Sequence, residues 1–306
     1  MQRSLRHKSF FRKENLTLQL MVFPALLAIL IFQYLPMAGV TISFMDYSIP
    51  RGFMGSTWVG LKHFQEMFSD KYFYLALRNT LVISSLGFIF CFPAPIILAL
   101  IFNESPFGKF KKFVQTSSYL PHFLSYVVVA SLWTLLLDKK GLINNLLMNT
   151  GIVQSPVEFW TNPSMYWPLA ILLNLWQGTG WGAIIYMASI TNLNDEVYEA
   201  AIVDGAGRMR RIVSIILPTM KSTIIVMMIF SISGLFRSNF DQSYLLGNPF
   251  NRDKSYVLEY YVVDMGLNLM RYSYSTAVNL VQSAISIILF LAANQIARKV
   301  NDNGII

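Results

Sequence analysis

Long apolar runs separated by short polar stretches dominate the chain. Six of these runs carry almost no charge, at about 15–44, 79–102, 113–137, 166–190, 222–240 and 272–297. A helix of about 20 apolar residues matches the thickness of the hydrocarbon core of a bilayer. We therefore predict an all-α integral membrane protein with six transmembrane helices, one for each run.

The segments between the runs form the ends and loops of this plan. Residues 1–14 are a terminal segment, 45–78 an external loop, 191–221 a cytoplasmic loop, and 79–300 contain the core transmembrane domain. The first run follows a basic stretch, as in a secretory signal, but it is too long and lacks a convincing cleavage site. We expect it to remain as a membrane anchor.

The cationic residues predict which loops face the cytoplasm. With both termini inside, fourteen of the 24 Lys and Arg residues lie in inner segments and nine in outer loops, while Arg237 lies within the fifth run. Cytoplasmic loops are enriched in Lys and Arg. We therefore predict that the N- and C-termini are both cytoplasmic, and we attribute the net charge of +8 to topology rather than to nucleic-acid binding.

Composition agrees with a membrane protein and excludes several kinds of chemistry. Hydrophobic residues make up 54% of the chain and charged residues 13%, whereas about 25% of residues are charged in soluble domains. The single cysteine, Cys91, excludes an internal disulfide. No phosphate-binding Gly-x-x-x-x-Gly-Lys-Ser/Thr run is present, and the three histidines lie in separate segments. We predict no catalytic activity, no cofactor and no metal site in this chain.

The cytoplasmic loop 191–221 predicts a short helix with clear ends. Asn194 is a suitable N-cap, acidic residues follow it at the positive end of the helix dipole, and Gly205 is a suitable terminator. Ala200 and Ala201 leave a smooth face for close contact with another protein. A basic stretch then leads to Pro218. A helix lying at the lipid headgroups is the alternative interpretation of such a loop.

The residues of this loop resemble the EAA loop of binding-protein-dependent ABC importer permeases. The pattern Glu-Ala-Ala, three residues, Gly, nine residues, Ile-x-Leu-Pro is filled at every position. The resemblance implies a type I importer permease with the MetI-like fold, whose short helix couples it to an ATP-binding subunit. The implied coupling residues are Glu199, Ala200, Ala201, Asp204, Gly205, Ala206, Ile215, Leu217 and Pro218.

Further segments resemble the carbohydrate branch of these permeases, in particular the permeases for polysaccharides and complex oligosaccharides. They are Tyr34-Leu-Pro-Met-x-Gly39, Trp58-Val-Gly-Leu61, Gln115-Thr-Ser-Ser-Tyr-Leu-Pro-His-Phe123 and Trp176-Gln-Gly-Thr-Gly-Trp181. The resemblance implies a multi-pass subunit of the bacterial cytoplasmic membrane. Its implied partners are a second homologous permease, two ABC subunits that bind ATP and Mg, an extracytoplasmic binding protein and a carbohydrate.

A sugar pathway requires aromatic platforms together with amide and charged groups. The residues that supply these groups are Trp176, Gln177, Trp181, Arg237, Asn239 and Asp241. Arg237 is a costly charge within a predicted span, and Asp241 follows one helical turn later, so the two are candidates for an ion pair. Snorkelling of Arg237 to the membrane surface is the alternative. For His122 we favour a packed, hydrogen-bonded side chain over a gate or sugar contact.

Three other functions compete with an oligosaccharide importer. An ABC permease for another solute would share the loop pattern. A secondary transporter would need buried ionisable residues near the middle of the membrane, for which Arg237 is the one candidate. A membrane enzyme would need grouped acids, and Asp138 and Asp264 are isolated in the sequence.

Overall fold

The structure, a computed structural model, describes residues 13–105 and 108–301. Residues 1–12, which carry most of the predicted basic segment and His7, lie outside this range. In chain order, the first half contains α1 Lys13–Ile29, η1 Leu30–Tyr34, α2 Leu35–Met37, η2 Ala38–Phe44, β1 Met45–Asp46, β2 Thr57–Trp58, α3 Lys62–Ser69, α4 Lys71–Phe90, α5 Pro93–Glu104, α6 Gly108–Tyr119, η3 Leu120–Phe123, α7 Tyr126–Leu136 and α8 Leu142–Asn149. The second half contains α9 Pro163–Ile190, α10 Asp195–Val203, α11 Arg208–Arg211, η4 Ile212–Ile216, α12 Leu217–Ser233, α13 Phe240–Leu246, α14 Arg252–Ser255, α15 Leu258–Val263, η5 Asp264–Asn268 and α16 Tyr272–Asn301.

Four helical segments in the described part are long and apolar enough to cross a membrane. They are Gln19–Phe44, Lys71–Glu104, Arg208–Ser233 and Tyr272–Lys299, and a bent pair of helices would make a fifth. The helical class is therefore confirmed, whereas six spans remain a prediction. The segment α9 has 28 residues but falls outside this group. Polar residues such as Asn174 and Gln177 lie in its middle.

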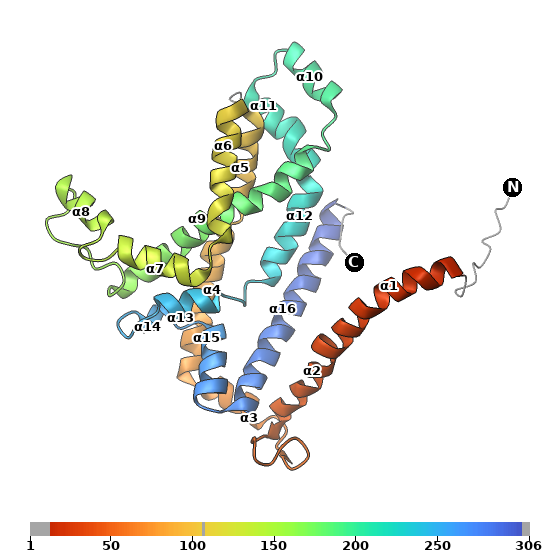
Figure 1. The fold of residues 1–306 in the computed structure, drawn as a ribbon, viewed down its shortest axis with the longest axis vertical. Coiled ribbons are helices and arrows are strands. Elements are labelled where there is room, and N and C mark those ends of the chain that lie inside the picture. Colours follow the sequence, from red (N-terminus) through yellow and green to blue (C-terminus); the bar gives the residue numbers. More distant parts are fainter. Residues whose placement is uncertain (1–12, 106–107, 302–306) are drawn as a thin grey trace.

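The third predicted run, 113–137, is not one straight helix. It comprises parts of α6 and α7, which are bent by 105° relative to each other (Figure 1). Pro121 lies in the 3-10 turn after α6, Leu124 is extended, and the Ser125 side chain accepts a hydrogen bond from the Val128 amide to start α7. Proline and a new N-cap together end one helix and begin the next. Hydropathy alone did not detect this break.

The helix observed in the region of the fifth predicted run, 222–240, begins and ends earlier than the run does. The helix begins at Arg208 and continues through Pro218, where a π-helical turn at η4 precedes the proline. It ends at Ser233, and residues 234–239 form a non-helical linker to α13. Arg237 and Asp241 therefore do not share a helical face, and no described ion pair joins them. The prediction of one helix bearing both residues is wrong.

One small sheet interrupts the helical fold. Strands β1 and β2 pair antiparallel, with Met45 opposite Trp58 and Asp46 opposite Thr57. This hairpin and α3 lie at the end of the molecule opposite α10 (Figure 1). The predicted external loop 45–78 thus contains ordered structure, and α4 already begins at Lys71.

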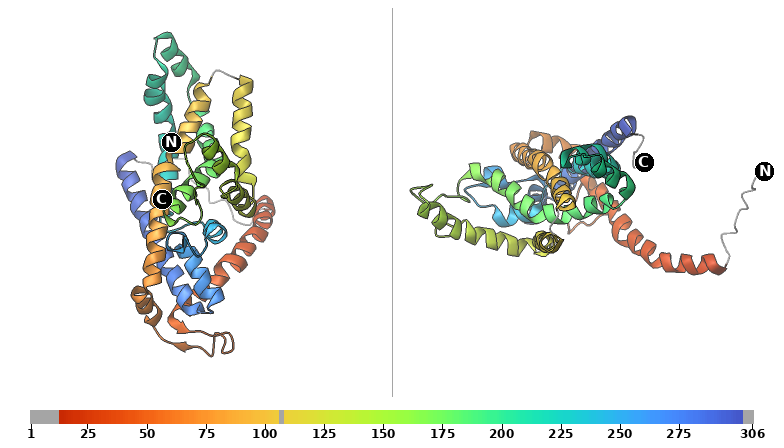
Figure 2. Two further views of the ribbon diagram at one scale, coloured as in Figure 1. Left: turned by 90° about the vertical axis from the view of Figure 1, so that its left-hand side faces the viewer. Right: turned by 90° about the horizontal axis from the view of Figure 1, so that it is seen from above.

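The buried core follows the long axis of the molecule as several clusters. One cluster, including Met67, Tyr261 and Tyr274, joins α3, α4, α15 and α16. A second joins α4, α7 and α9, and a third, including Ile216 and Met220, joins α5, α9 and the helix Arg208–Ser233. The segment Gln19–Phe44 has no buried residue in its most apolar window and stands apart from the bundle except near η2 (Figure 2). Such an exposed apolar helix requires lipid or another subunit around it.

Candidate functional site

The helix predicted for the loop 191–221 is α10, and its two ends are fixed by local hydrogen bonds. The Asn194 side chain accepts from the Glu196 amide, which confirms the predicted N-cap. At the other end, the Ala206 amide donates to the Ala201 carbonyl and the Gly205 amide to the Ile202 carbonyl, with Gly205 at a φ of +77°. This is the Schellman arrangement, in which glycine takes the left-handed position. The spacing from Ala201 to Gly205 in the motif therefore has a direct structural reason.

Three side chains brace α10 against the transmembrane helices. The Tyr198 hydroxyl donates to Glu104 Oε1 over 2.5 Å, and Arg211 Nη2 donates to Glu104 Oε2 over 2.9 Å. Arg211 Nη1 also donates to the Ala206 carbonyl, and its guanidinium lies over the Tyr198 ring. Burial and the hydrogen bond to Glu104 raise the pKa of Tyr198, so its hydroxyl remains a donor. We call Glu104, Tyr198 and Arg211 the brace.

The brace joins three elements that are far apart in the sequence. Glu104 is the last residue of α5, Tyr198 lies within α10, and Arg211 lies at the start of the helix that continues to Ser233. The Glu104 and Arg211 side chains are only 10% and 14% exposed. Partly buried ion pairs are screened less by solvent than surface pairs. The brace therefore connects α10 directly to α5 and to the helix Arg208–Ser233.

The opposite face of α10 is open. Glu199 and Ala200 are exposed, and no described residue forms an ion pair with Glu199. Val203 is 86% exposed and Met209, just beyond the helix, 71%. This face of α10 is therefore accessible to another protein. Figure 1 shows α10 projecting at one extreme of the molecule.

The remaining motif residues lie beside α10. A small cavity of about 280 Å³ is lined by Ala201, Asp204, Ala206, Arg210, Arg211, Ser214 and Ile215. Leu217 and Pro218 follow in the membrane helix, where the Thr219 hydroxyl donates to the Ile215 carbonyl. The structure thus places Ile215, near the end of the motif, close to the C-terminal end of α10.

The predicted pathway residues divide between two cavities. Arg237 and Asn239 line an open cavity of about 890 Å³ between α4, α5, α9 and α12, which also contains Asn174 and Gln242. Gln177 lines a neighbouring cavity of about 390 Å³, which shares Asn174 with the first. Asp241 is exposed and lines neither cavity.

The two predicted tryptophans lie outside the lining of both cavities. Trp176 contacts Trp133 edge to face, with ring centroids 6.0 Å apart. Trp181 is stacked on His122 at 4.6 Å. His122 itself is exposed, lines the smaller cavity and has no hydrogen bond to any described residue. The packed part of the interpretation of His122 agrees with this stacking, whereas the expected hydrogen bond has no partner among the described residues.

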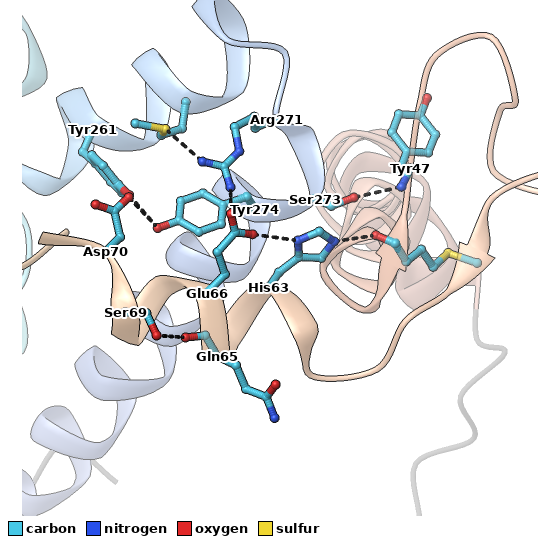
Figure 3. Close-up of polar contacts among 12 residues, drawn as sticks. Tyr47, His63, Gln65, Glu66, Ser69, Asp70, Tyr261, Arg271, Ser273 and Tyr274 are labelled. Carbon is cyan, nitrogen blue, oxygen red and sulfur yellow. Dashed lines mark hydrogen bonds and ion pairs between the residues drawn. The ribbon is translucent and has the colours of Figure 1, made fainter. Parts of the chain in front are cut away.

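A polar network fixes the opposite end of the molecule (Figure 3). Asp70 caps α4 through the Tyr72 amide and accepts from the hydroxyls of Tyr261 and Tyr274 over 2.7 and 3.3 Å. Glu66 of α3 pairs with Arg271. Burial, together with hydrogen bonds to Tyr274 and Asp70, raises the pKa of Tyr261. These contacts hold α3, α15 and α16 together.

The two acids that are isolated in the sequence, Asp138 and Asp264, form local hydrogen bonds. Asp264 accepts from Tyr256 and Arg252, and Asp138 accepts from the Lys140 amide. Within the described ranges, no group of three or more His, Cys, Asp or Glu residues could hold a metal ion.

Sequence reasoning missed Glu104, Asn174 and Gln242. Glu104 lies 94 residues from its partner Tyr198, and neither residue belongs to the EAA pattern. A single acid at the end of an apolar run was the one signal that could have indicated Glu104. Asn174 and Gln242 were detectable only as amides within or beside spans, and their side chains contact each other.

A protein with several apolar membrane helices and a rigidly capped, exposed helix at one end fits a class of inner-membrane transport components. Residues 92–302 match the family described as the inner membrane component of binding-protein-dependent transport systems. The match covers more than half of the chain, which belongs to this family. The predicted family is confirmed, and membership places the chain in the membrane as a multi-pass protein.

Individual relatives are similar to this chain over most of its length. The chain is 44% identical to the polygalacturonan/rhamnogalacturonan transport system permease protein YteP of Bacillus subtilis (strain 168), over 94% of this chain and 89% of that protein. It is 42% identical to protein LplB of the same organism, over 96% and 92%. A solved bacterial alginate ABC transporter, in complex with a periplasmic protein bound to alginate pentasaccharide, contains a chain with a TM-score of 0.87 and 34% identity, over 96% and 98%.

Proposed function

We propose that this chain is the permease subunit of an ATP-driven importer that moves an oligosaccharide or polysaccharide fragment delivered by an extracytoplasmic binding protein. Its partners would be a second homologous permease and two ABC subunits that bind ATP and Mg. The single observation that carries the proposal is α10, which is capped at both ends, exposed on one face and braced on the other. The named substrates of the relatives support a carbohydrate.

In this account, α10 docks in the ATP-binding subunit through Glu199, Ala200 and Val203. When the two ATP-binding subunits close on ATP, they displace α10. The brace passes this displacement to α5 and to the helix Arg208–Ser233, which line the larger cavity. The cavity opens outward on closure and inward after hydrolysis. The motif residues from Ala201 to Ala206 act mainly by fixing the shape of α10.

We propose six membrane crossings with both termini cytoplasmic. Four crossings would be the segments that meet the length and apolarity requirements. The bent pair α6 and α7 would supply the fifth crossing, and α9, with 28 residues, would supply the sixth. Polar residues in α9 are tolerated in this arrangement because they face cavities rather than lipid.

Uptake by reconstituted vesicles tests this function against its rivals. The assembled complex, with a fluorescent or radioactive oligosaccharide loaded on its binding protein, should accumulate sugar only when ATP and the binding protein are both present. Uptake driven by a proton or sodium gradient without ATP would indicate a secondary transporter. Conversion of the sugar to a new product would indicate an enzyme, and either result would reject the proposal.

A further inference from the structure

The larger cavity contains one charged residue among its described lining residues. The other lining residues are apolar side chains, glycines, hydroxyls and amides, and the single charge belongs to Arg237. The cavity volume of about 890 Å³ lies within the range of roughly 300–1,000 Å³ that small-molecule sites occupy. The described lining of the cavity therefore carries one positive charge and no acid.

The backbone beside Arg237 is bonded to two of the apolar spans, while its side chain is exposed at the cavity. The adjacent Phe236 carbonyl accepts a hydrogen bond from Gln282, which is ten residues, or about 15 Å, along α16 from Tyr272. The Arg237 carbonyl accepts from Ser84, thirteen residues or about 20 Å along α4. Both contacts therefore lie within apolar spans and away from the first turn of each helix. Figure 1 shows the linker from α12 to α13 at the level of the middle of α16.

The guanidinium has no partner in the described part of the chain. It forms no ion pair or side-chain hydrogen bond there. The nearby acid Glu259 accepts from Ser238 and Gln282 instead. Asp241, four residues away in the sequence, is exposed and lies outside the cavity lining. A charge beside apolar spans is retained in proteins when it faces water or binds a partner or a ligand.

Resting on the proposed function, we infer that Arg237 binds a carboxylate of an acidic oligosaccharide as the sugar passes through the cavity. A guanidinium forms paired hydrogen bonds with a carboxylate, which makes it selective for uronate sugars. The Ser84 and Ser231 hydroxyls donate to backbone carbonyls, and the Asn239 side-chain oxygen accepts from the Gln242 amide. The two hydroxyl oxygens can still accept from sugar hydroxyls and the Asn239 amide group can donate to them, while Phe88 and Phe240 line the cavity as surfaces for ring faces. The transported class is therefore a uronate-containing oligosaccharide.

The test compares acidic and neutral sugars in vesicles that contain the complete importer and its binding protein. Two pools of equal chain length are offered. One contains oligogalacturonates and oligoalginates, and the other contains neutral oligosaccharides. Sugar inside the vesicles is identified by mass spectrometry and expressed per ATP hydrolysed, so that the result does not depend on how much complex is active.

Wild-type importer should take up sugar from the acidic pool. Arg237→Gln should reduce acidic sugar imported per ATP by about tenfold, the effect expected for a lost charge-assisted hydrogen bond. Arg237→Lys, which keeps the charge but loses the paired geometry, should lose less. Lys140→Gln removes an exposed cation outside both cavities and should leave import unchanged.

Three results would overturn the inference while leaving the importer function intact. They are wild-type import from the neutral pool alone, unchanged acidic import by Arg237→Gln, and failure of Arg237→Gln to assemble with the second permease. The last result would assign the guanidinium to a carboxylate of that subunit. Import from neither pool by the wild type would instead contradict the proposed function itself.

Discussion

Glu104 forms hydrogen bonds with two other elements at the cytoplasmic end of the proposed topology. One carboxylate oxygen accepts from Tyr198 and the other from Arg211. Because each oxygen serves a different element, loss of the charge weakens both contacts at once. A substitution of Glu104 therefore tests whether α10 must be held rigidly for transport.

Glu104→Gln should lower the amount of sugar imported per ATP by roughly tenfold, because an amide cannot accept from both donors with its two terminal atoms. The measurement is uptake and ATP hydrolysis by the reconstituted complex. Glu196→Gln, at an exposed position of α10, is the matched control and should be neutral. An unchanged ratio of sugar to ATP in Glu104→Gln would remove the brace from the mechanism.

Gly205 is required for its backbone conformation rather than for space. A Cβ atom added there meets nothing within 4 Å, but φ is +77°. Gly205→Ala should therefore cost about 1 kcal/mol of local stability and increase hydrogen exchange of the Ala206 amide about fivefold. Gly207→Ala is the control, since Gly207 has a φ of −64° and open space. Equal exchange in the two variants would contradict the Schellman assignment.

At the scale of elements, the network around Asp70 holds together α3, α15 and α16 at the end that the proposed topology places outside (Figure 3). Asp70→Ala removes an N-cap, worth about 1 kcal/mol, and leaves two tyrosine hydroxyls without this acceptor, at roughly 1–3 kcal/mol. The variant should lower the thermal unfolding temperature of the detergent-solubilised chain. Asp70→Asn, which retains an acceptor oxygen, should lose much less. Equal losses would show that the cap and the tyrosine contacts do not depend on that oxygen.

Sequence patterns predicted some elements well and others poorly. Capping residues specify α10, because Asn194 and Gly205 act on their immediate neighbours. The bend between α6 and α7 was missed because hydropathy reports apolarity and not direction, although Pro121 marked the place. The end of α12 at Ser233 was missed because the linker 234–239 remains largely uncharged. The brace depends on contacts between residues that are 94 and 107 positions apart in the sequence, and a single sequence does not reveal such contacts.

At the scale of the whole molecule, the hairpin β1–β2 and the helix α10 mark opposite ends (Figure 1). Met54 in the hairpin is 99% exposed and Val203 of α10 is 86% exposed. The chain contains a single cysteine, Cys91, so that Cys91→Ser provides a cysteine-free background. These features allow each end to be assigned to one side of the membrane.

In that background, Met54→Cys should react with a membrane-impermeant maleimide in sealed right-side-out vesicles, and Val203→Cys should react only after the membrane is opened. Inverted vesicles should give the reverse pattern. Cys91→Ser alone is the control for background labelling. Reaction of Val203→Cys from the outside would place α10 on the wrong side for an ATP-binding subunit.

The most direct test of the central claim, that α10 couples the chain to an ATPase, is the double variant Glu199→Lys and Gly205→Trp in the reconstituted complex. Glu199→Lys fits the isolated chain because Glu199 is exposed, whereas Gly205→Trp strains the backbone locally at a φ of +77° and places a bulky ring on the exposed end of α10. Membrane insertion should be unaffected, while ATP hydrolysis should no longer drive sugar uptake. Normal ATP-driven uptake by this variant would contradict the account.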